Sequence, residues 1–284
     1  MKYLYSGLLA ALLVMTSCVT EPKPVPAAAV PAAPVAPVAV VAAPVPVPLI
    51  IKETISYADG IVDRVVTYEY AEGSFEYSAK VSRKPSLVDP VERVLRTFAG
   101  DRIAGQKTFD AAGLLVSESV YEYNAAGLLT RETIRDAKGI TQSVSDYKYS
   151  AAGQKTSWVV LNAAGNVLAQ TDYAYNATGS LKQIAMSKGA GIATGTAEYE
   201  YDAEKRLVGL TYYTPAKTVE RRTVYAWKDG NIAEETVYRS ENRLERRYKY
   251  TYGSNREILT RTLVDAGGAN REITVSEYRI LMRK

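Results

Sequence analysis

From residue 101 onward, β-branched and aromatic residues alternate with polar ones, and short polar turns interrupt this alternation at regular intervals. The clearest turns span 110–113, 124–127, 136–139, 150–153, 162–165 and 176–179; each begins with Asn, Asp or Ser and ends with Gly. This composition is typical of a type I turn closed by a glycine with positive φ, as in a G1-bulge hairpin. The turn glycines are separated by 14, 12, 14, 12 and 14 residues. The pattern therefore predicts antiparallel strands of about ten and eight residues in alternation.

A second regularity is the motif Tyr-x-Tyr, which returns every 26 residues just before a turn. Its members are Tyr121 and Tyr123, Tyr147 and Tyr149, Tyr173 and Tyr175, and Tyr199 and Tyr201. A fixed period of this length indicates a repeat architecture. Other turn compositions continue the rhythm after residue 179, so strands are expected up to residue 280.

The tyrosines of each motif share one face of their strand, because side chains alternate across a strand. The two preceding positions on that face hold small residues, such as Ser117 and Ser119 before Tyr121. We expect a strongly curved sheet with tyrosines packed inside the bend. The eight tyrosines of the motif are candidates either for a core ladder or for a ligand-facing row that stacks on sugars, and the core ladder is favoured because tyrosine suits half-buried strands.

The segment before residue 101 predicts three strands and one helix. The strands are expected at 50–57, 61–70 and 74–81, with Asp59 and Gly60 in a hairpin turn. The helix is expected at 90–99, because Asp89 can cap it, Pro90 suits its first turn and Gly100 can end it. Its predicted role is to cover the apolar edge of the first repeat.

The N-terminus has the features of an export signal followed by a spacer. Lys2 precedes a short apolar run, and the only cysteine, Cys18, follows Ser17 directly. This arrangement resembles a bacterial lipoprotein signal peptide, which implies cleavage before Cys18 and acylation of that residue; a secreted protein with a free thiol is the alternative. Nine of the twelve prolines lie between residues 19 and 48, which favours an extended polyproline tether. The expected domains are therefore a signal peptide at 1–17, a lipidated tether at 18–49 and a β-hairpin repeat domain at 50–284.

The segment Tyr121-Glu-Tyr-Asn-Ala-Ala-Gly-Leu128 resembles the YD repeat of the Rhs family, and the likeness covers roughly residues 101–252. The resemblance implies an all-β, antiparallel meander of hairpins wound into a curved or spiral sheet. In large members of that family such a sheet encloses a toxin, whereas this chain has no cargo domain after its repeats.

Residue composition excludes several kinds of chemistry. The chain has no histidine, and its one cysteine is assigned to the lipid anchor, so histidine-based catalysis, cysteine nucleophiles and zinc sites are not expected. The formal net charge is +4 with mixed signs along the strands, which does not favour nucleic-acid binding. No catalytic residue, metal or cofactor is predicted.

The sequence therefore predicts a non-enzymatic lipoprotein of the cell envelope, more consistent with the outer membrane or cell surface than with the inner membrane. Its predicted role is a structural or protein-interaction module. The alternatives are a carbohydrate-binding module that uses exposed Tyr and Trp rows, and a glycan hydrolase whose two carboxylates meet only in the fold. The expected partners are the lipid membrane, reached through Cys18, and an envelope protein or a glycan.

Overall fold

The computed structural model describes residues 45–71, 76–100, 102–189 and 191–283, which form a single antiparallel sheet. The strands are β1 (Val45–Tyr57), β2 (Val62–Tyr70), β3 (Tyr77–Arg83), β4 (Ser86–Ala99), β5 (Arg102–Asp110), β6 (Leu115–Tyr123), β7 (Leu129–Asp136), β8 (Thr141–Tyr149), β9 (Lys155–Asn162), β10 (Val167–Tyr175), β11 (Leu181–Lys188), β12 (Ile192–Tyr201), β13 (Leu207–Tyr213), β14 (Val219–Lys228), β15 (Asn231–Arg239), β16 (Leu244–Tyr252), β17 (Ile258–Asp265) and β18 (Asn270–Arg283). A short 3-10 turn, η1 (Ser240–Asn242), joins β15 to β16. The described residues contain no helix with the length and apolar character needed to cross a membrane.

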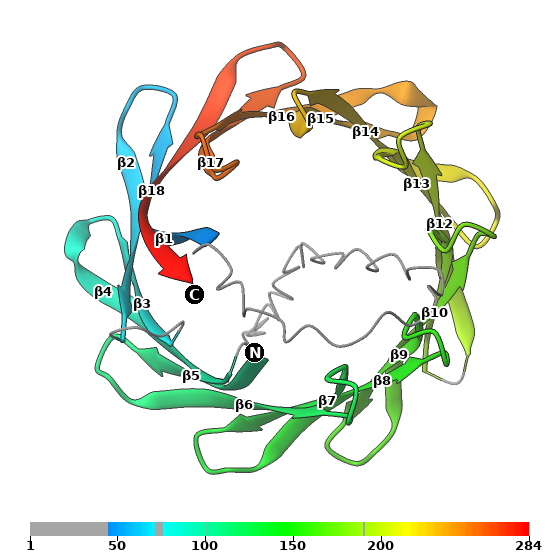
Figure 1. The fold of residues 1–284 in the computed structure, drawn as a ribbon, viewed down its shortest axis with the longest axis horizontal. Helices are drawn as coiled ribbons and strands as arrows, with labels where there is room; N and C mark the ends of the chain where they lie inside the picture. The colour runs from blue at the N-terminus through cyan, green and yellow to red at the C-terminus, as the bar shows by residue number, and fades with distance from the viewer. Residues whose placement is uncertain (1–44, 72–75, 101, 190, 284) are drawn as a thin grey trace, which may run out of the picture. The chain divides into compact units, whose positions relative to one another are not determined.

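The sheet closes on itself, because each strand pairs with its neighbour in sequence and β1 also pairs with β18. The closing pair runs from Val45 opposite Arg283 to Tyr57 opposite Glu272, and Figure 1 shows the resulting ring of strands. The prediction of a curved or spiral sheet of the YD type is therefore wrong, because the sheet is a closed barrel. Strand pairing between the two ends of the chain removes both free edges of the sheet, which an open spiral would leave exposed.

The turns lie where Gly, Asn, Asp and Ser mark them in the sequence. In the turn after β6, the Gly127 amide donates to the Asn124 carbonyl at 2.8 Å and the Asn124 amide donates to the Leu128 carbonyl at 2.9 Å. Gly127 has φ of +81°, the left-handed conformation that closes such a turn. The Asn124 side chain also accepts the Leu128 amide at 2.9 Å, so the residue that opens the turn stabilises its far side.

The predicted helix at 90–99 is wrong, because these residues belong to β4, which pairs with both β3 and β5. Pro90 lies opposite Ser82, where the register between β3 and β4 shifts, and a bulge is where a strand tolerates proline. The capping signals around Asp89 are local, whereas two neighbouring strands offer hydrogen bonds along the whole segment. The predicted cap also has no edge to cover, since β1 is paired on both sides.

Other boundaries differ modestly from those expected. β1 begins at Val45, so it includes five residues assigned to the tether. The strands expected at 61–70 and 74–81 correspond to β2 and β3, and residues 72–75 between them are not described. The signal peptide, Cys18 and the tether up to residue 44 lie outside the described residues and remain predictions.

Residues directly opposite one another in neighbouring strands share a face of the sheet, which divides the side chains into two sets. We call the face that carries Tyr121, Tyr147, Tyr173, Tyr199 and Tyr225 the tyrosine face. The other face, which we call the charged face, carries cross-strand ion pairs such as Arg131 with Asp146.

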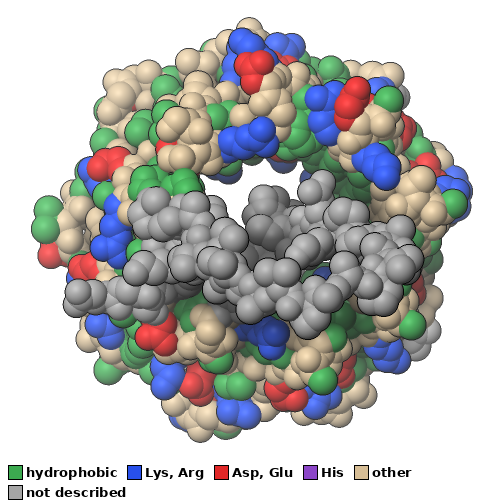
Figure 2. Space-filling view, viewed as in Figure 1, with side chains coloured by type: hydrophobic (Ala, Val, Ile, Leu, Met, Phe, Trp, Pro, Cys, Tyr) green, Lys and Arg blue, Asp and Glu red, His purple; other side chains and the backbone are tan. Residues whose placement is uncertain are grey.

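The tyrosine face lines the inside of the barrel. Side chains converge on the concave side of a closed sheet and spread apart on the convex side, so the inner face is the more buried one. Ala197, Tyr147 and Val237 on the tyrosine face are buried. Several exposed apolar residues, by contrast, belong to the charged face: Leu95, Val116, Leu168 and Val275. Figure 2 shows the open space that this ring of side chains surrounds.

Candidate functional site

The second aromatic residue of each Tyr-x-Tyr motif fastens its strand to the preceding one. In seven successive even-numbered strands, from β6 to β18, its hydroxyl or indole N–H donates to the backbone carbonyl 20 residues earlier, at 2.7 to 3.0 Å. The donors are Tyr123, Tyr149, Tyr175, Tyr201, Trp227, Tyr252 and Tyr278. β4 has Phe98 at the matching place and therefore lacks the donor. These side-chain donors are therefore used in hydrogen bonds within the sheet.

The first tyrosine of each motif lies deeper in the wall. Tyr147 is 8% exposed, while Tyr121, Tyr173 and Tyr199 are half-buried. Burial raises the pKa of Tyr121, Tyr147 and Tyr173 to about 12, because a buried phenolate loses its hydration. These rings form the aromatic layer of the inner wall.

The motif continues further around the barrel than the sequence prediction placed it. Tyr225 with Trp227, Tyr250 with Tyr252, and Ser276 with Tyr278 occupy the same positions in β14, β16 and β18. Three changes concealed them: a tryptophan in the second place, a spacing of 25 residues between Trp227 and Tyr252, and a serine in the first place. The constant signal was an aromatic residue in the second half of every second strand.

Lys155 interrupts the regular chemistry of the inner wall. Its carbonyl accepts the Tyr175 hydroxyl, and in the other six bonds of this kind the acceptor residue is Leu or Ile. The Lys155 amine lies 5.0 Å from the Tyr147 ring centre and 5.5 Å from that of Tyr173. Burial lowers its pKa. Tyr147 in turn stacks on Trp158, with ring centres 6.2 Å apart and planes within 3°.

The outer wall is polar along the strands. Ion pairs that bridge neighbouring strands on the charged face are Lys52 with Glu277, Lys80 with Glu69, Lys107 with Glu118, Arg131 with Asp146, and Arg247 with Glu234, at 2.6 to 4.0 Å. Their side chains are partly exposed, so they contribute little to stability. They do keep the outer wall charged near the strand centres.

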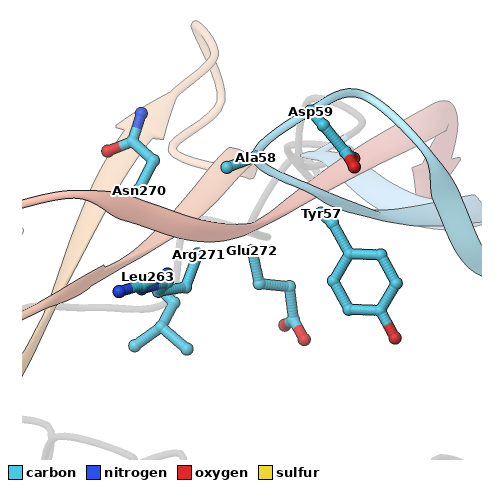
Figure 3. Close-up of a pocket in the computed structure, with 7 residues that line it drawn as sticks. All are labelled: Tyr57, Ala58, Asp59, Leu263, Asn270, Arg271 and Glu272. Atoms are coloured by element: carbon cyan, nitrogen blue, oxygen red, sulfur yellow. The ribbon is translucent and has the colours of Figure 1, made fainter.

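The structure provides little for conventional catalysis. Within the described ranges, no group of three or more His, Cys, Asp or Glu residues could hold a metal. One open hollow, of about 520 Å³, lies between the β1–β2 turn and the β17–β18 end. Figure 3 shows Tyr57, Leu263 and Glu272 pointing to one side of the sheet there and Asn270 to the other. These residues line an open surface rather than an enclosed pocket.

The carboxylates whose pKa is perturbed are held ionised by donors. Hydrogen bonding to Arg239 lowers the pKa of Glu245. The Ala269 amide, followed by Arg271, lowers the pKa of Asp265. A glycan hydrolase needs one carboxyl group with a raised pKa to act as its acid, so the perturbed carboxylates behave in the opposite way.

Comparison with known proteins leaves the chain without a family. No family model matches it, and no curated protein matches its sequence. Among solved structures, a porin-like protein from Bacteroides uniformis is 12% identical, with a TM-score of 0.43, over 81% of this chain and 98% of that one. A porin-like protein from Bacteroides vulgatus is 9% identical, with a TM-score of 0.20, over the same shares. A protein from Arabidopsis thaliana is 13% identical, with a TM-score of 0.23, over 57% of this chain and 80% of that one. TM-scores this low establish no common fold, and the closed barrel therefore rests on the strand pairing alone.

The predicted functions do not fit this geometry. The predicted module is a curved or spiral sheet of YD-type hairpins, whereas this sheet is closed by β1 and β18. A carbohydrate platform needs exposed aromatic rows, whereas the rows lie on the inner wall and their second hydroxyls bond to backbone. The closed barrel therefore corrects the predicted role as a YD-type module.

Proposed function

We propose that residues 45–283 work as a water-filled sleeve: a closed tube that stands in the aqueous phase and takes an elongated, soluble guest into its bore. The observation that carries this proposal is the closure of eighteen strands around an inner wall of tyrosines and short side chains. The protein acts by enclosing and guiding its guest, without chemistry of its own.

The size of the bore supports this role. Eighteen strands, spaced about 4.8 Å apart and tilted by about 40°, give a backbone diameter on the order of 35 Å. Two layers of inward side chains leave a passage of about 20 Å, since barrels of 16–18 strands hold an aqueous channel. A passage of this width admits an extended chain or a narrow polymer, and it is too wide for side chains alone to fill.

The charge of the outer wall argues that the tube is not embedded in lipid. A barrel in a membrane presents an apolar band, and each Arg or Lys at the bilayer midplane costs about 2–4 kcal/mol. Lys52, Lys80, Lys107 and Arg131 lie within strands on the outer wall, each beside a carboxylate. Water is the better solvent for such a surface.

The location of the sleeve is proposed from its N-terminus. We infer that the leader exports the chain to the cell envelope and that Cys18 carries lipid, with the Pro-rich segment as a spacer. This arrangement would hold a water-soluble barrel near a membrane without inserting it. Acyl anchoring suits such a barrel, because the anchor and the charged wall then contact different phases.

The test compares reagent access to the two faces of one strand. In a Cys18→Ser background, Thr171→Cys places a thiol on the tyrosine face of β10, and Gln170→Cys places one on the charged face as the matched control. We expect a small maleimide to label both thiols, and a maleimide carried by a large polymer to label Gln170→Cys at least tenfold faster. Equal labelling by the large reagent would show that the wall is open, and failure of the small reagent at Thr171→Cys would show that the bore is filled.

A lipid assay separates the sleeve from a membrane channel. We expect the Cys18→Ser chain to remain in the aqueous phase when mixed with vesicles and to produce no discrete conductance steps in a planar bilayer. Stable steps would overturn the proposal in favour of a channel that inserts in lipid.

A further inference from the structure

The inner wall carries a cluster of arginines where β14, β15 and β16 begin or end. Arg221 and Arg239 lie directly opposite each other in the β14–β15 pair, on the face shared with Tyr225. Like charges in this position destabilise a sheet. Arg246 lies on the neighbouring strand β16. It is opposite Val237, which is two residues before Arg239 on β15.

One carboxylate, that of Glu245, interacts with all three arginines. Glu245 accepts from Arg239 Nε at 3.2 Å and pairs with Arg246 Nη1, and Arg221 contributes to its electrostatic environment. The next carboxylate, Asp265, lies opposite Arg246 but is engaged by Arg271 at 2.5 Å and by the Ala269 amide at 2.9 Å. The group formed by Arg221, Arg239, Arg246 and Glu245 therefore carries an excess of two positive charges.

The arginines are positioned and keep unused donors. The Arg221 guanidinium lies 4.6 Å from the Tyr212 ring centre, and that of Arg246 lies 5.9 Å from the Tyr248 ring centre. Arg246 Nε is buried without a hydrogen-bond partner in the described part of the chain. The Arg239 side chain is 59% exposed, which leaves the cluster open to the bore.

We propose that Arg221, Arg239 and Arg246 form a binding site for a tetrahedral oxyanion, a phosphate or sulfate group, on the inner wall of the barrel. Guanidinium groups present paired N–H donors that match the oxygens of such a group. Binding would neutralise the repulsion between Arg221 and Arg239. This site rests on the side-chain geometry and stands whether or not the bore takes a larger guest.

The experiment titrates the full chain with inorganic phosphate by isothermal calorimetry, with sulfate as competitor. We expect saturable binding that sulfate displaces. Arg239→Gln should weaken this binding at least tenfold. The matched control is Arg222→Gln, which removes an arginine from the same β14 strand on the charged face, opposite Tyr238, and should change affinity less than twofold. Glu245→Gln removes the competing carboxylate and should tighten binding several-fold.

Stability measurements exclude a purely structural effect. Arg221→Gln relieves the like-charge pair, so it should raise the Tm without phosphate while weakening phosphate binding; a misfolded variant would lose both. Absence of saturable binding by the unaltered chain would overturn the site. Equal losses in Arg239→Gln and Arg222→Gln, or weaker binding by Glu245→Gln, would also overturn it.

Discussion

The Tyr175 hydroxyl donates a hydrogen bond of 2.9 Å to the carbonyl of Lys155, 20 residues earlier on the neighbouring strand. The same bond recurs in the hairpins on either side, from Tyr149 to Leu129 and from Tyr201 to Leu181. Each ties the last residue of an even-numbered strand to the first residue of the strand before it. The recurring motif therefore supplies one side-chain hydrogen bond between neighbouring strands in each successive hairpin of the barrel.

Removing one such hydroxyl should cost a measurable part of the stability. We expect Tyr175→Phe to lower the free energy of unfolding by about 1 kcal/mol, the net contribution of one hydrogen bond. Denaturant titration measures the change. The control is Tyr238→Phe, since the Tyr238 hydroxyl has no hydrogen-bond partner in the described chain and lies on the charged face. A loss in the control equal to that in Tyr175→Phe would contradict the fastening role.

The local features of this fold were readable in the sequence, whereas its closure was not. Turns such as 124–127 carry their own chemistry, so their position follows from a few residues. Pairing of Thr54 with Val275 joins the two ends of the chain, and no local pattern records that contact. The helix expected at 90–99 failed for a different reason: its capping signals are local, whereas the segment forms hydrogen-bonded pairs with both β3 and β5 along its length.

The arginine cluster shows a similar limit. In the sequence, the run from Arg243 to Arg247 has mixed charges, and this pattern does not distinguish a binding site from a solvated face. The bulge between β15 and β16 turns Glu245 and Arg246 toward Arg239, and the β14–β15 register brings Arg221 to the same place. Register, rather than composition, assembles the site.

Lys205 keeps the turn geometry of a glycine that the sequence lacks. Its φ is +62°, and its amide donates to the Asp202 carbonyl at 3.0 Å, as Gly127 does to Asn124. A left-handed conformation costs a non-glycine residue about 1–2 kcal/mol in the folded state. Replacement by glycine removes this cost, but the greater entropy of glycine in the unfolded chain offsets part of the gain. We expect Lys205→Gly to stabilise the protein by about 0.5–1 kcal/mol in denaturant titration. Lys205→Ala retains the strained Cβ and should give no gain; a gain in that control would mean that charge, not backbone strain, was responsible.

Alkaline titration should reveal the buried tyrosine row. The pKa of Tyr121, Tyr147 and Tyr173 rises from 10.0 in the unfolded reference to about 12 in the fold, with burial as the largest cause. A raised folded pKa contributes stability that is complete below pH 10 and is lost as the pH rises from 10 toward 12. We expect phenolate absorbance and circular dichroism to change together in that window. Full ionisation at pH 10 with the sheet intact would contradict the burial of this row.

Replacing Lys155 by leucine, the residue at the equivalent position of neighbouring hairpins, should stabilise the protein. Its pKa is lowered by burial, so its charged form is disfavoured in the fold at neutral pH, and this penalty fades as the pH approaches the unfolded value of about 10.4. The contacts with Tyr147 and Tyr173 offset part of it. We expect Lys155→Leu to raise the Tm by about 2 °C at pH 7. The reciprocal change, Leu181→Lys, should lower it; the same sign for both would contradict a position-specific penalty.

Closure of the barrel can be tested by a single covalent bond between its first and last strands. Thr54 and Val275 lie directly opposite each other in the β1–β18 pair, where a separation of about 5.5 Å between Cα atoms suits a disulfide. In a Cys18→Ser background, we expect Thr54→Cys with Val275→Cys to form a bond within one chain under mild oxidation. The product should migrate differently from the reduced chain on a denaturing gel.

The control pair, Thr54→Cys with Glu277→Cys, shares the face but is offset by two residues. Its diagonal separation of about 7–8 Å exceeds what a disulfide tolerates, so it should oxidise far more slowly. An open spiral would keep residues 54 and 275 at opposite ends of the sheet, and they could then join only between chains. Dimers in place of the intramolecular product would therefore refute the closed ring. An intramolecular bond at the expected register would bring together residues 221 positions apart, a contact that an open sheet cannot make.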